Sequence, residues 1–177
     1  MIENYSSVEF LKNGKYIAAR DYLSVKVWDI ANTKKPLMNV SLQETMKTKL
    51  CEVFENDCIF DKFKLTSSND GNTLLTGTYN NCFHVIDTVD GSNTQFELNY
   101  KKTTLARNII PEKPPALTKM DYIRKTNACD FNKKKNSLAV ASLNCFFIYS
   151  MWLTSFILFK FLLFNKYLFI HFFVSKK

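Results

Sequence analysis

The same short pattern occurs three times along the chain: a strand-like stretch rich in small residues, a polar turn, and a second, apolar strand-like stretch. The paired stretches are 16–19 with 24–29, 74–78 with 83–87, and 137–142 with 146–149. A period of two, β-branched residues and a turn every few residues are typical of antiparallel strands joined in sequence. The chain is therefore predicted to be all-β and to consist of repeats.

Each copy has a strand of small residues, a turn, and an apolar strand that ends in Trp28-Asp29 or an equivalent. This pattern is typical of a blade of a WD-type β-propeller, whose usual period is about 40–45 residues. Trp28 is expected to pack between blades. The copies in this chain are spaced more widely, so both connections between blades are predicted to carry insertions. The expected blades are approximately 5–41, 57–98 and 125–149, with insertions 42–56 and 99–124 and a C-terminal tail 150–177.

The two insertions differ in character. The first is predicted to contain a helix that begins after a Ser41 cap, and the segment that follows it, 58–63, is predicted to be a strand. The second holds three of the four prolines and an excess of Lys and Arg, so it is predicted to be a basic surface loop. Because known propellers have about four to eight blades, three blades are expected to be only part of one.

The sequence offers little support for an enzyme, a cofactor or a metal site. It has no phosphate-binding glycine loop and no nucleophile elbow. His84 and His171 lie far apart, and the five cysteines include no C-x-x-C pair, so no metal site is expected. The cysteines are predicted to be small buried side chains in a reducing compartment. His84 is expected at a surface or hydrogen-bonded position, and Asp21 is expected to bond within its own turn.

The formal net charge of +8 does not indicate a nucleic-acid-binding protein. Half of it comes from four lysines in residues 150–177, a segment with no acid and seven of the sixteen phenylalanines. The first 150 residues are therefore only weakly basic, and no nucleic acid is expected as a partner.

One acidic segment stands out against this basic background. Residues 52–61 contain four acids and no base, and apolar residues such as Phe54 and Phe60 lie between the acids. A solvated acidic loop would explain the charges alone. Acids beside aromatic side chains on a connection between blades favour recognition of a basic, amphipathic peptide.

Three segments make the chain recognisable: 20–29 (RDYLSVKVWD), 49–63 (KLCEVFENDCIFDKF) and 76–87 (TGTYNNCFHVID). They closely resemble the 55-kDa regulatory B subunits of protein phosphatase 2A, and residues 55–63 are the most specific part. The resemblance covers residues 1–149 and implies the last three blades of a seven-bladed propeller, a C-terminal fragment of the family's fold. Blade 3 departs from the family, with Cys129 and Asn132 where Trp and His-Pro are usual.

The resemblance implies a non-catalytic subunit that selects substrates for a serine/threonine phosphatase. The implied partners are the phosphatase scaffold (A) and catalytic (C) subunits, and phosphoproteins with basic segments near the phosphorylated residue. Separately from the resemblance, the unpaired cysteines and an N-terminus without a signal-peptide pattern predict the cytosol, with the nucleus as a second compartment. The family positions that line the substrate groove correspond here to Cys51, Phe54, Glu55, Asp57, Phe60 and Lys62. Phe54 stands where the family usually has Tyr, so any contact through that hydroxyl is lost.

Two other classes remain open at this stage. The first is a generic WD-repeat interaction scaffold that binds no phosphatase. The second is a protein anchored to a membrane by its tail, although Lys160 and Lys166 divide the apolar run and a membrane is not the expected partner. Most residues of 151–177 are of types that can be encoded with A and T alone, which favours translated non-coding, AT-rich DNA as the origin of the tail.

Overall fold

The computed structural model describes residues 4–12, 14–98, 121–135, 137–143, 145–150, 161–164 and 167–170. These residues form three antiparallel sheets in which consecutive strands are neighbours. Blade 1 consists of β1 (Ser7–Leu11), β2 (Tyr16–Arg20), β3 (Ser24–Asp29) and β4 (Met38–Ser41). Blade 2 consists of β5 (Leu65–Ser67), β6 (Thr73–Gly77), β7 (Cys82–Asp87) and β8 (Asn93–Glu97). Blade 3 consists of β9 (Ala128–Phe131), β10 (Ser137–Ser142), β11 (Cys145–Ser150), β12 (Phe161–Phe164) and β13 (Tyr167–Ile170).

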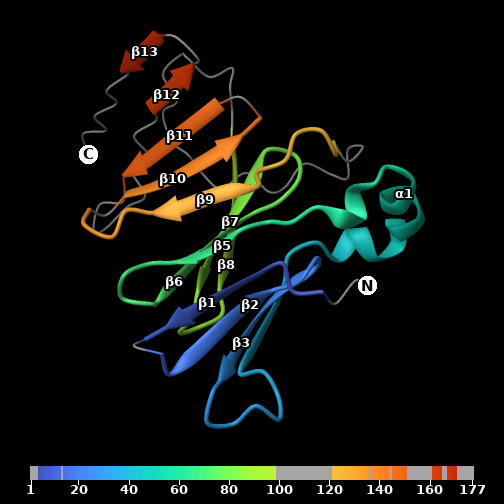
Figure 1. Cartoon of the computed structure of the whole chain (residues 1–177), viewed down its shortest axis with the longest axis vertical. Helices are drawn as coiled ribbons and strands as arrows, with labels where there is room; N and C mark the ends of the chain where they lie inside the picture. Colours follow the sequence, from blue (N-terminus) through green and yellow to red (C-terminus); the bar gives the residue numbers. More distant parts are fainter. Residues whose placement is uncertain are drawn as a thin grey trace.

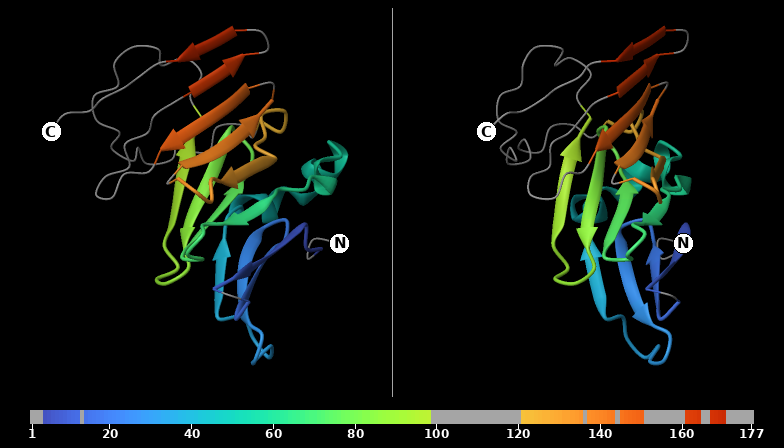
Figure 2. Two further views of the ribbon diagram at one scale, coloured as in Figure 1. Left: turned by 60° about the vertical axis from the view of Figure 1, so that its left-hand side comes forward. Right: turned by 90° about the vertical axis from the view of Figure 1, so that its left-hand side faces the viewer.

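The three blades lie in chain order, with blade 2 between blades 1 and 3 (Figures 1 and 2). The first strand of blade 2, β5, contacts both β1 and β9, so the first strands of the three blades lie together. This is the arrangement of neighbouring blades around a propeller axis. The prediction of an all-β, partial propeller is confirmed.

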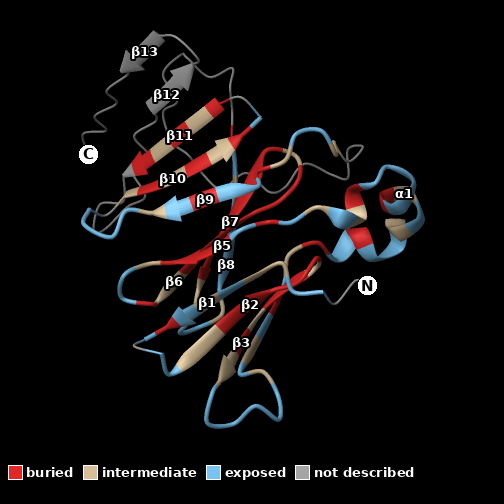
Figure 3. Cartoon of the chain, viewed as in Figure 1, coloured by how far each residue is buried: buried red, intermediate tan, exposed pale blue. Residues whose placement is uncertain are grey.

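Apolar side chains fill both spaces between the blades. Figure 3 shows the buried residues concentrated in the strands of blade 2 and the strands next to it. Leu74 and Ile86 of blade 2 pack against blade 1, while Phe83 and Val85 pack against blade 3. Because blade 2 is covered on both faces, its strands are apolar at successive positions instead of alternating. Blade 2 is therefore the centre of the hydrophobic core.

The turn between β2 and β3 is held by a carboxylate, as the sequence predicted. Asp21 Oδ1 accepts the backbone N–H groups of Leu23 at 2.9 Å and Ser24 at 2.6 Å, and Oδ2 accepts the Ser24 hydroxyl at 2.7 Å. Lys26 Nζ lies 3.0 Å from the same carboxylate. Burial acts to raise the pKa of Asp21, but the bonds from Ser24 and Lys26 hold that pKa below its ordinary value. Asp21 is thus a structural residue.

The connection from β4 to β5 is helical. It contains η1 (Glu44–Lys49), α1 (Leu50–Glu55) and η2 (Cys58–Phe60). The helix predicted after Ser41 is present, but the Ser41 hydroxyl bonds the Glu44 carboxylate at 2.5 Å, and the residue before the helix, Gln43, makes no side-chain cap.

The strand predicted at 58–63 is wrong. Asp57 has a left-handed backbone with φ of 58°, which turns the chain just before η2. The Asp61 N–H then donates to the Cys58 carbonyl at 3.0 Å and closes a helical turn. The apolar residues of this segment therefore belong to a tight turn, and β5 begins only at Leu65.

Two segments of the tail add strands that the sequence did not predict. β12 pairs with β11, with Phe147 opposite Leu162, and β13 pairs with β12. Blade 3 therefore has five strands. Within the described residues, no helix is long and apolar enough to cross a membrane. Most of the tail, and the predicted basic loop 99–124 as far as residue 120, lie outside the described residues.

Blade 1 has an open face that carries Val8, Phe10, Ile17 and Trp28. The pair Phe10 and Ile17 in blade 1 corresponds to the pair Ser67 and Leu74 in blade 2. In blade 2, Ser67 and Leu74 are buried against blade 1. Yet Val8 is 56% exposed and Phe10 is 66% exposed. Trp28 was predicted to pack between blades, but it is only half-buried here, because no described residues form a blade beyond it.

We expect this open face to make the isolated 177-residue chain self-associate, because burying exposed apolar side chains is favourable by about 25 cal/mol per Å². Phe10→Lys should shift the chain strongly toward monomer in sedimentation velocity without lowering its melting temperature. Val89→Lys is the matched control, since Val89 is also exposed, at 74%, but lies on the β7–β8 turn. A chain that stays monomeric at all concentrations would show that the open face is not adhesive.

Candidate functional site

The helical connection between blades 1 and 2 is attached to the blades by buried apolar side chains. Met46 and Val53 are fully buried, and Cys58 is nearly so. They pack in one cluster with Phe63 and Tyr79, at the same end of the blades as the β2–β3 turn. The connection is therefore part of the folded body, although it projects from the side of the blades (Figure 1).

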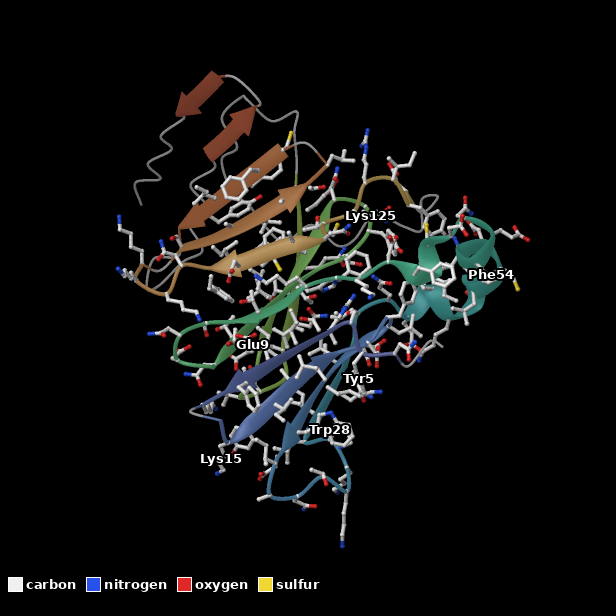
Figure 4. The ribbon with its side chains drawn as sticks, in the orientation of Figure 1. Tyr5, Glu9, Lys15, Trp28, Phe54 and Lys125 are labelled. Carbon is white, nitrogen blue, oxygen red and sulfur yellow. The ribbon has the colours of Figure 1, made fainter. Side chains whose placement is uncertain are left out.

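All six residues predicted to line the groove are exposed on this connection. They are Cys51, Phe54, Glu55, Asp57, Phe60 and Lys62. Phe54 is 59% exposed and Phe60 is 61% exposed, and Figure 4 shows Phe54 on α1, outside the blades. We call this set the acidic surface. Buried anchor residues alternate with exposed acidic and aromatic residues along this connection. The exposed side chains can therefore contact another molecule.

The four acids of the segment do not play the same part. Glu55 and Asp57 are exposed, and Glu52 is half-buried. Asp61 is engaged within the protein, because Lys125 Nζ lies 2.5 Å from its Oδ1 and the Tyr79 hydroxyl lies 2.7 Å from its Oδ2. The charge available to a partner is therefore smaller than the sequence indicated.

Tyr79 is the centre of a buried polar group beneath the acidic surface. Its hydroxyl oxygen lies 2.7 Å from Asp61 Oδ2, 3.0 Å from the Cys58 carbonyl oxygen and 2.9 Å from the Tyr22 hydroxyl. Tyr79 has one hydrogen to donate to Asp61 or Cys58, and it can accept the hydrogen of Tyr22. Burial, followed by the bonds to Tyr22 and Asp61, raises the pKa of Tyr79, so the hydroxyl stays protonated.

Aromatic rings surround this hydroxyl group. The Phe63 ring lies 5.1 Å from the ring of Tyr79, and the Tyr122 ring lies 5.6 Å from it, both edge to face. Edge-to-face pairs at this distance stabilise a fixed ring position. The ring of Tyr79 is therefore held independently of its hydroxyl bonds.

The turn between β6 and β7 holds the segment that precedes blade 3. Asn80 and Asn81 both have left-handed backbones, with φ of 59° and 55°. Asn tolerates this conformation better than most residues, and two such residues suit a tight hairpin turn. Asn80 Oδ1 accepts the Asp121 N–H at 2.7 Å, and the Asn81 N–H donates to the Arg124 carbonyl at 2.9 Å. These bonds fix the segment that carries Lys125.

The other residues singled out in the sequence lie away from this surface. His84 is buried, and its Nδ1 lies 2.9 Å from Asn93 Oδ1, so it is a hydrogen-bonded position as predicted. Burial lowers the pKa of His84 to about 4. Four cysteines are buried as predicted, whereas Cys51 is exposed. No group of potential metal ligands occurs among the described residues.

Curated proteins that resemble the chain have consistent names. The serine/threonine-protein phosphatase 2A regulatory subunit phr2AB of Dictyostelium discoideum is 32% identical over 164 residues, which cover 85% of this chain and 34% of the relative. The regulatory B subunit of protein phosphatase PP2A from Schizosaccharomyces pombe is 33% identical over 180 residues, covering 85% of this chain and 39% of the relative. The chain is a homologue of the phosphatase 2A regulatory B subunits.

A third homologue, the beta isoform of the 55 kDa regulatory B subunit of Carassius auratus, is 31% identical over 159 residues, 84% of this chain and 36% of its own length. The resemblance drawn from the sequence is therefore confirmed. The chain spans about a third of the length of these relatives. Each relative is named a regulatory subunit, in agreement with the prediction that the chain is not an enzyme. No protein-family model matches the chain.

Solved structures support the fold. The β-propeller domain of Cps50 (Swd1) from Myceliophteria thermophila superposes with a TM-score of 0.55 over 90% of this chain and 38% of that one, at 13% identity. The RRP9 WD40 repeats give a TM-score of 0.56 over 85% of this chain and 36% of that one, at 8% identity. At these identities the likeness shows a WD40-type propeller fold and nothing about function.

Sequence patterns alone do not reveal the residues beneath the acidic surface. They place Tyr79 only in a turn, and Lys125 only at the edge of a basic loop. Both bond Asp61, which lies 18 residues before Tyr79 and 64 before Lys125. The best available signal is that Tyr79 lies within a segment, 76–87, that closely resembles the B subunits.

Proposed function

We propose that this chain carries a substrate-selecting surface of a non-catalytic regulatory B subunit of protein phosphatase 2A. Two findings support this function. The homologues are named regulatory subunits, and the six residues matched to the family's groove all have exposed side chains on one anchored connection. The exposure of those six side chains together is the observation that carries the proposal.

The chemistry of the acidic surface suits a basic, amphipathic segment of a phosphoprotein. Exposed carboxylates at Glu55 and Asp57 attract Lys and Arg side chains and increase the rate of encounter. The exposed rings of Phe54 and Phe60 offer apolar contact next to those charges. Lys62 can pair with an acid of the bound segment. The partner is then held by charge and by apolar burial together.

The proposed partners are the scaffold and catalytic subunits of the phosphatase, and the proposed location is the cytosol, with the nucleus as a second compartment. The chain would contribute no catalytic group. It would raise the local concentration of phosphoproteins whose basic segments flank the phosphorylated residue, and the catalytic subunit would remove the phosphate.

Affinity purification of the tagged gene product from its own cells tests this assignment. We expect the scaffold and catalytic subunits to be recovered together and the preparation to release phosphate from a phosphopeptide. The control is a tagged unrelated WD-repeat protein, which should recover neither subunit. If the gene product also recovers neither, it is a generic interaction scaffold and the proposal is wrong.

A further inference from the structure

We propose that Tyr79, acting through Asp61 and the Cys58 carbonyl, positions the turn that presents Asp57 and Phe60, and that Lys125 completes this support. The inference rests on the proposed function of the acidic surface. Tyr79 and Lys125 are positioning residues, because both reach the surface only through Asp61 and the backbone.

The turn that carries Asp57 and Phe60 has a defined backbone shape. Asp57 is left-handed, η2 covers residues 58–60, and the Asp61 N–H donates to the Cys58 carbonyl at 3.0 Å. The side chains of Asp57 and Phe60 are thus carried by a single short turn that runs from Asp57 to Asp61. Any movement of this turn displaces both exposed side chains together.

The hydroxyl of Tyr79 holds this turn from below. It lies 3.0 Å from the carbonyl of Cys58 and 2.7 Å from the carboxylate of Asp61. It therefore contacts the beginning of η2 and the residue that follows its end at once. Tyr79 itself is only 2% exposed and is packed edge to face against Phe63, so it is a rigid support.

Lys125 holds the same turn from the side of blade 3. Its ammonium group lies 2.5 Å from Asp61 Oδ1, the carboxylate oxygen that Tyr79 does not contact. The Asp61 side chain is 15% exposed and that of Lys125 is 32% exposed, so the pair is partly shielded from water. Blade 2 and the segment that leads into blade 3 therefore both hold the turn. The charge of Asp61 is balanced by Lys125, whereas the Asp57 carboxylate stays exposed.

The hydroxyl of Tyr79 can be removed without removing the fold. Phenylalanine keeps the ring contacts with Phe63 and Tyr122. The Cys58 carbonyl still accepts the Asp61 N–H, and Asp61 still has Lys125. Tyr79→Phe is therefore expected to loosen the turn and leave the blades intact.

The experiment compares Tyr79→Phe with Tyr22→Phe in the 177-residue chain. Among the described residues, the Tyr22 hydroxyl is hydrogen-bonded to Tyr79 alone, so its loss leaves the contacts of Tyr79 with Cys58 and Asp61 in place. Two quantities are measured: the affinity for a Lys/Arg-rich peptide with one apolar residue, and the hydrogen-exchange rate of the Phe60 and Asp61 amides.

We expect Tyr79→Phe to weaken peptide binding about two- to tenfold, because the free energy of about one lost internal hydrogen bond limits how far the turn is released from its binding shape. It should also speed exchange at Phe60 and Asp61, while Tyr22→Phe changes both quantities by less. Unchanged exchange in Tyr79→Phe would overturn the inference. The inference would also be overturned if Tyr79→Phe speeds hydrogen exchange but leaves the peptide affinity unchanged, while Asp57→Lys weakens peptide binding.

The proposed function can fail separately. If the unmodified chain does not bind the basic peptide at all, the acidic surface is not a substrate site. The exchange rates alone then decide whether Tyr79 fixes the turn, and equal rates in Tyr79→Phe and the unmodified chain would reject that as well.

Discussion

Replacing Gly77 by alanine is expected to force blades 2 and 3 apart. Gly77 ends β6, and a Cβ at this position would lie 1.7 Å from the carbonyl oxygen of Thr126 and 2.7 Å from its carbonyl carbon. Both are backbone atoms, so a side-chain rotation cannot relieve the clash. Thr126 is fully buried, and its N–H donates to the Thr78 carbonyl at 2.9 Å, a bond that must lengthen if the backbones separate.

The expected cost of Gly77→Ala is roughly 3 kcal/mol or more, the upper range for overpacking in a core. Chemical denaturation followed by circular dichroism measures the loss. Gly14→Ala is the matched control, because Gly14 has φ of +82° but nothing within 4 Å of its Cβ position. That control should lose only about 1 kcal/mol through backbone strain. An equal loss in the two variants would mean that blades 2 and 3 are not in close contact at Gly77.

Much of the fold could be predicted because the strands obey a local pattern. Residues 24–29 alternate and form β3, and residues 83–87 form most of β7. Properties that are visible in the sequence predict such strands: a period of two in β3, an apolar run in β7, and polar turns beside both. The order of the strands within each blade then follows from the short connections between neighbouring strands.

The error at residues 58–63 has a tertiary cause. The segment is rich in apolar and aromatic residues, a composition that favours a strand. It nevertheless follows a left-handed Asp57, and Tyr79 and Lys125 hold it as a turn. Contacts with residues 18 to 64 positions away have no signature in the local sequence. The added strands β12 and β13 were missed for a related reason, because composition alone suggested a segment unrelated to the blades.

The candidate surface was predictable in part. Its six residues came from the resemblance to the B subunits, and the structure shows that all six are exposed. The buried anchors Val53 and Cys58, and the separate role of Asp61, depend on packing beneath the connection. The number of acids in the sequence could not show that Asp61 is paired with Lys125 while Glu55 and Asp57 are exposed.

The acidic surface is expected to bind basic substrates without supporting the fold. Asp57→Lys tests this most directly, because Asp57 is exposed at the turn before η2. A charge-assisted hydrogen bond contributes about 1.5–3 kcal/mol, so the variant should bind a basic peptide at least about tenfold more weakly. The loss should shrink as salt rises, because screening weakens exposed charges.

Three controls make that measurement specific. Phe60→Ala should weaken binding almost equally at low and high salt, because it removes apolar contact. Glu97→Lys makes the same charge change on an exposed residue of β8 and should leave binding nearly unchanged. Asp57→Asn keeps a residue that tolerates the left-handed backbone and removes only the charge.

The decisive measurement is the affinity of the 177-residue chain and its Asp57→Lys variant for a basic peptide at two salt concentrations, with the melting temperature of each. We predict a salt-sensitive loss of about tenfold or more in the variant and a melting temperature close to that of the unmodified chain. Equal affinity in the two proteins, or a variant that no longer folds, would contradict the assignment of Asp57 to a binding surface.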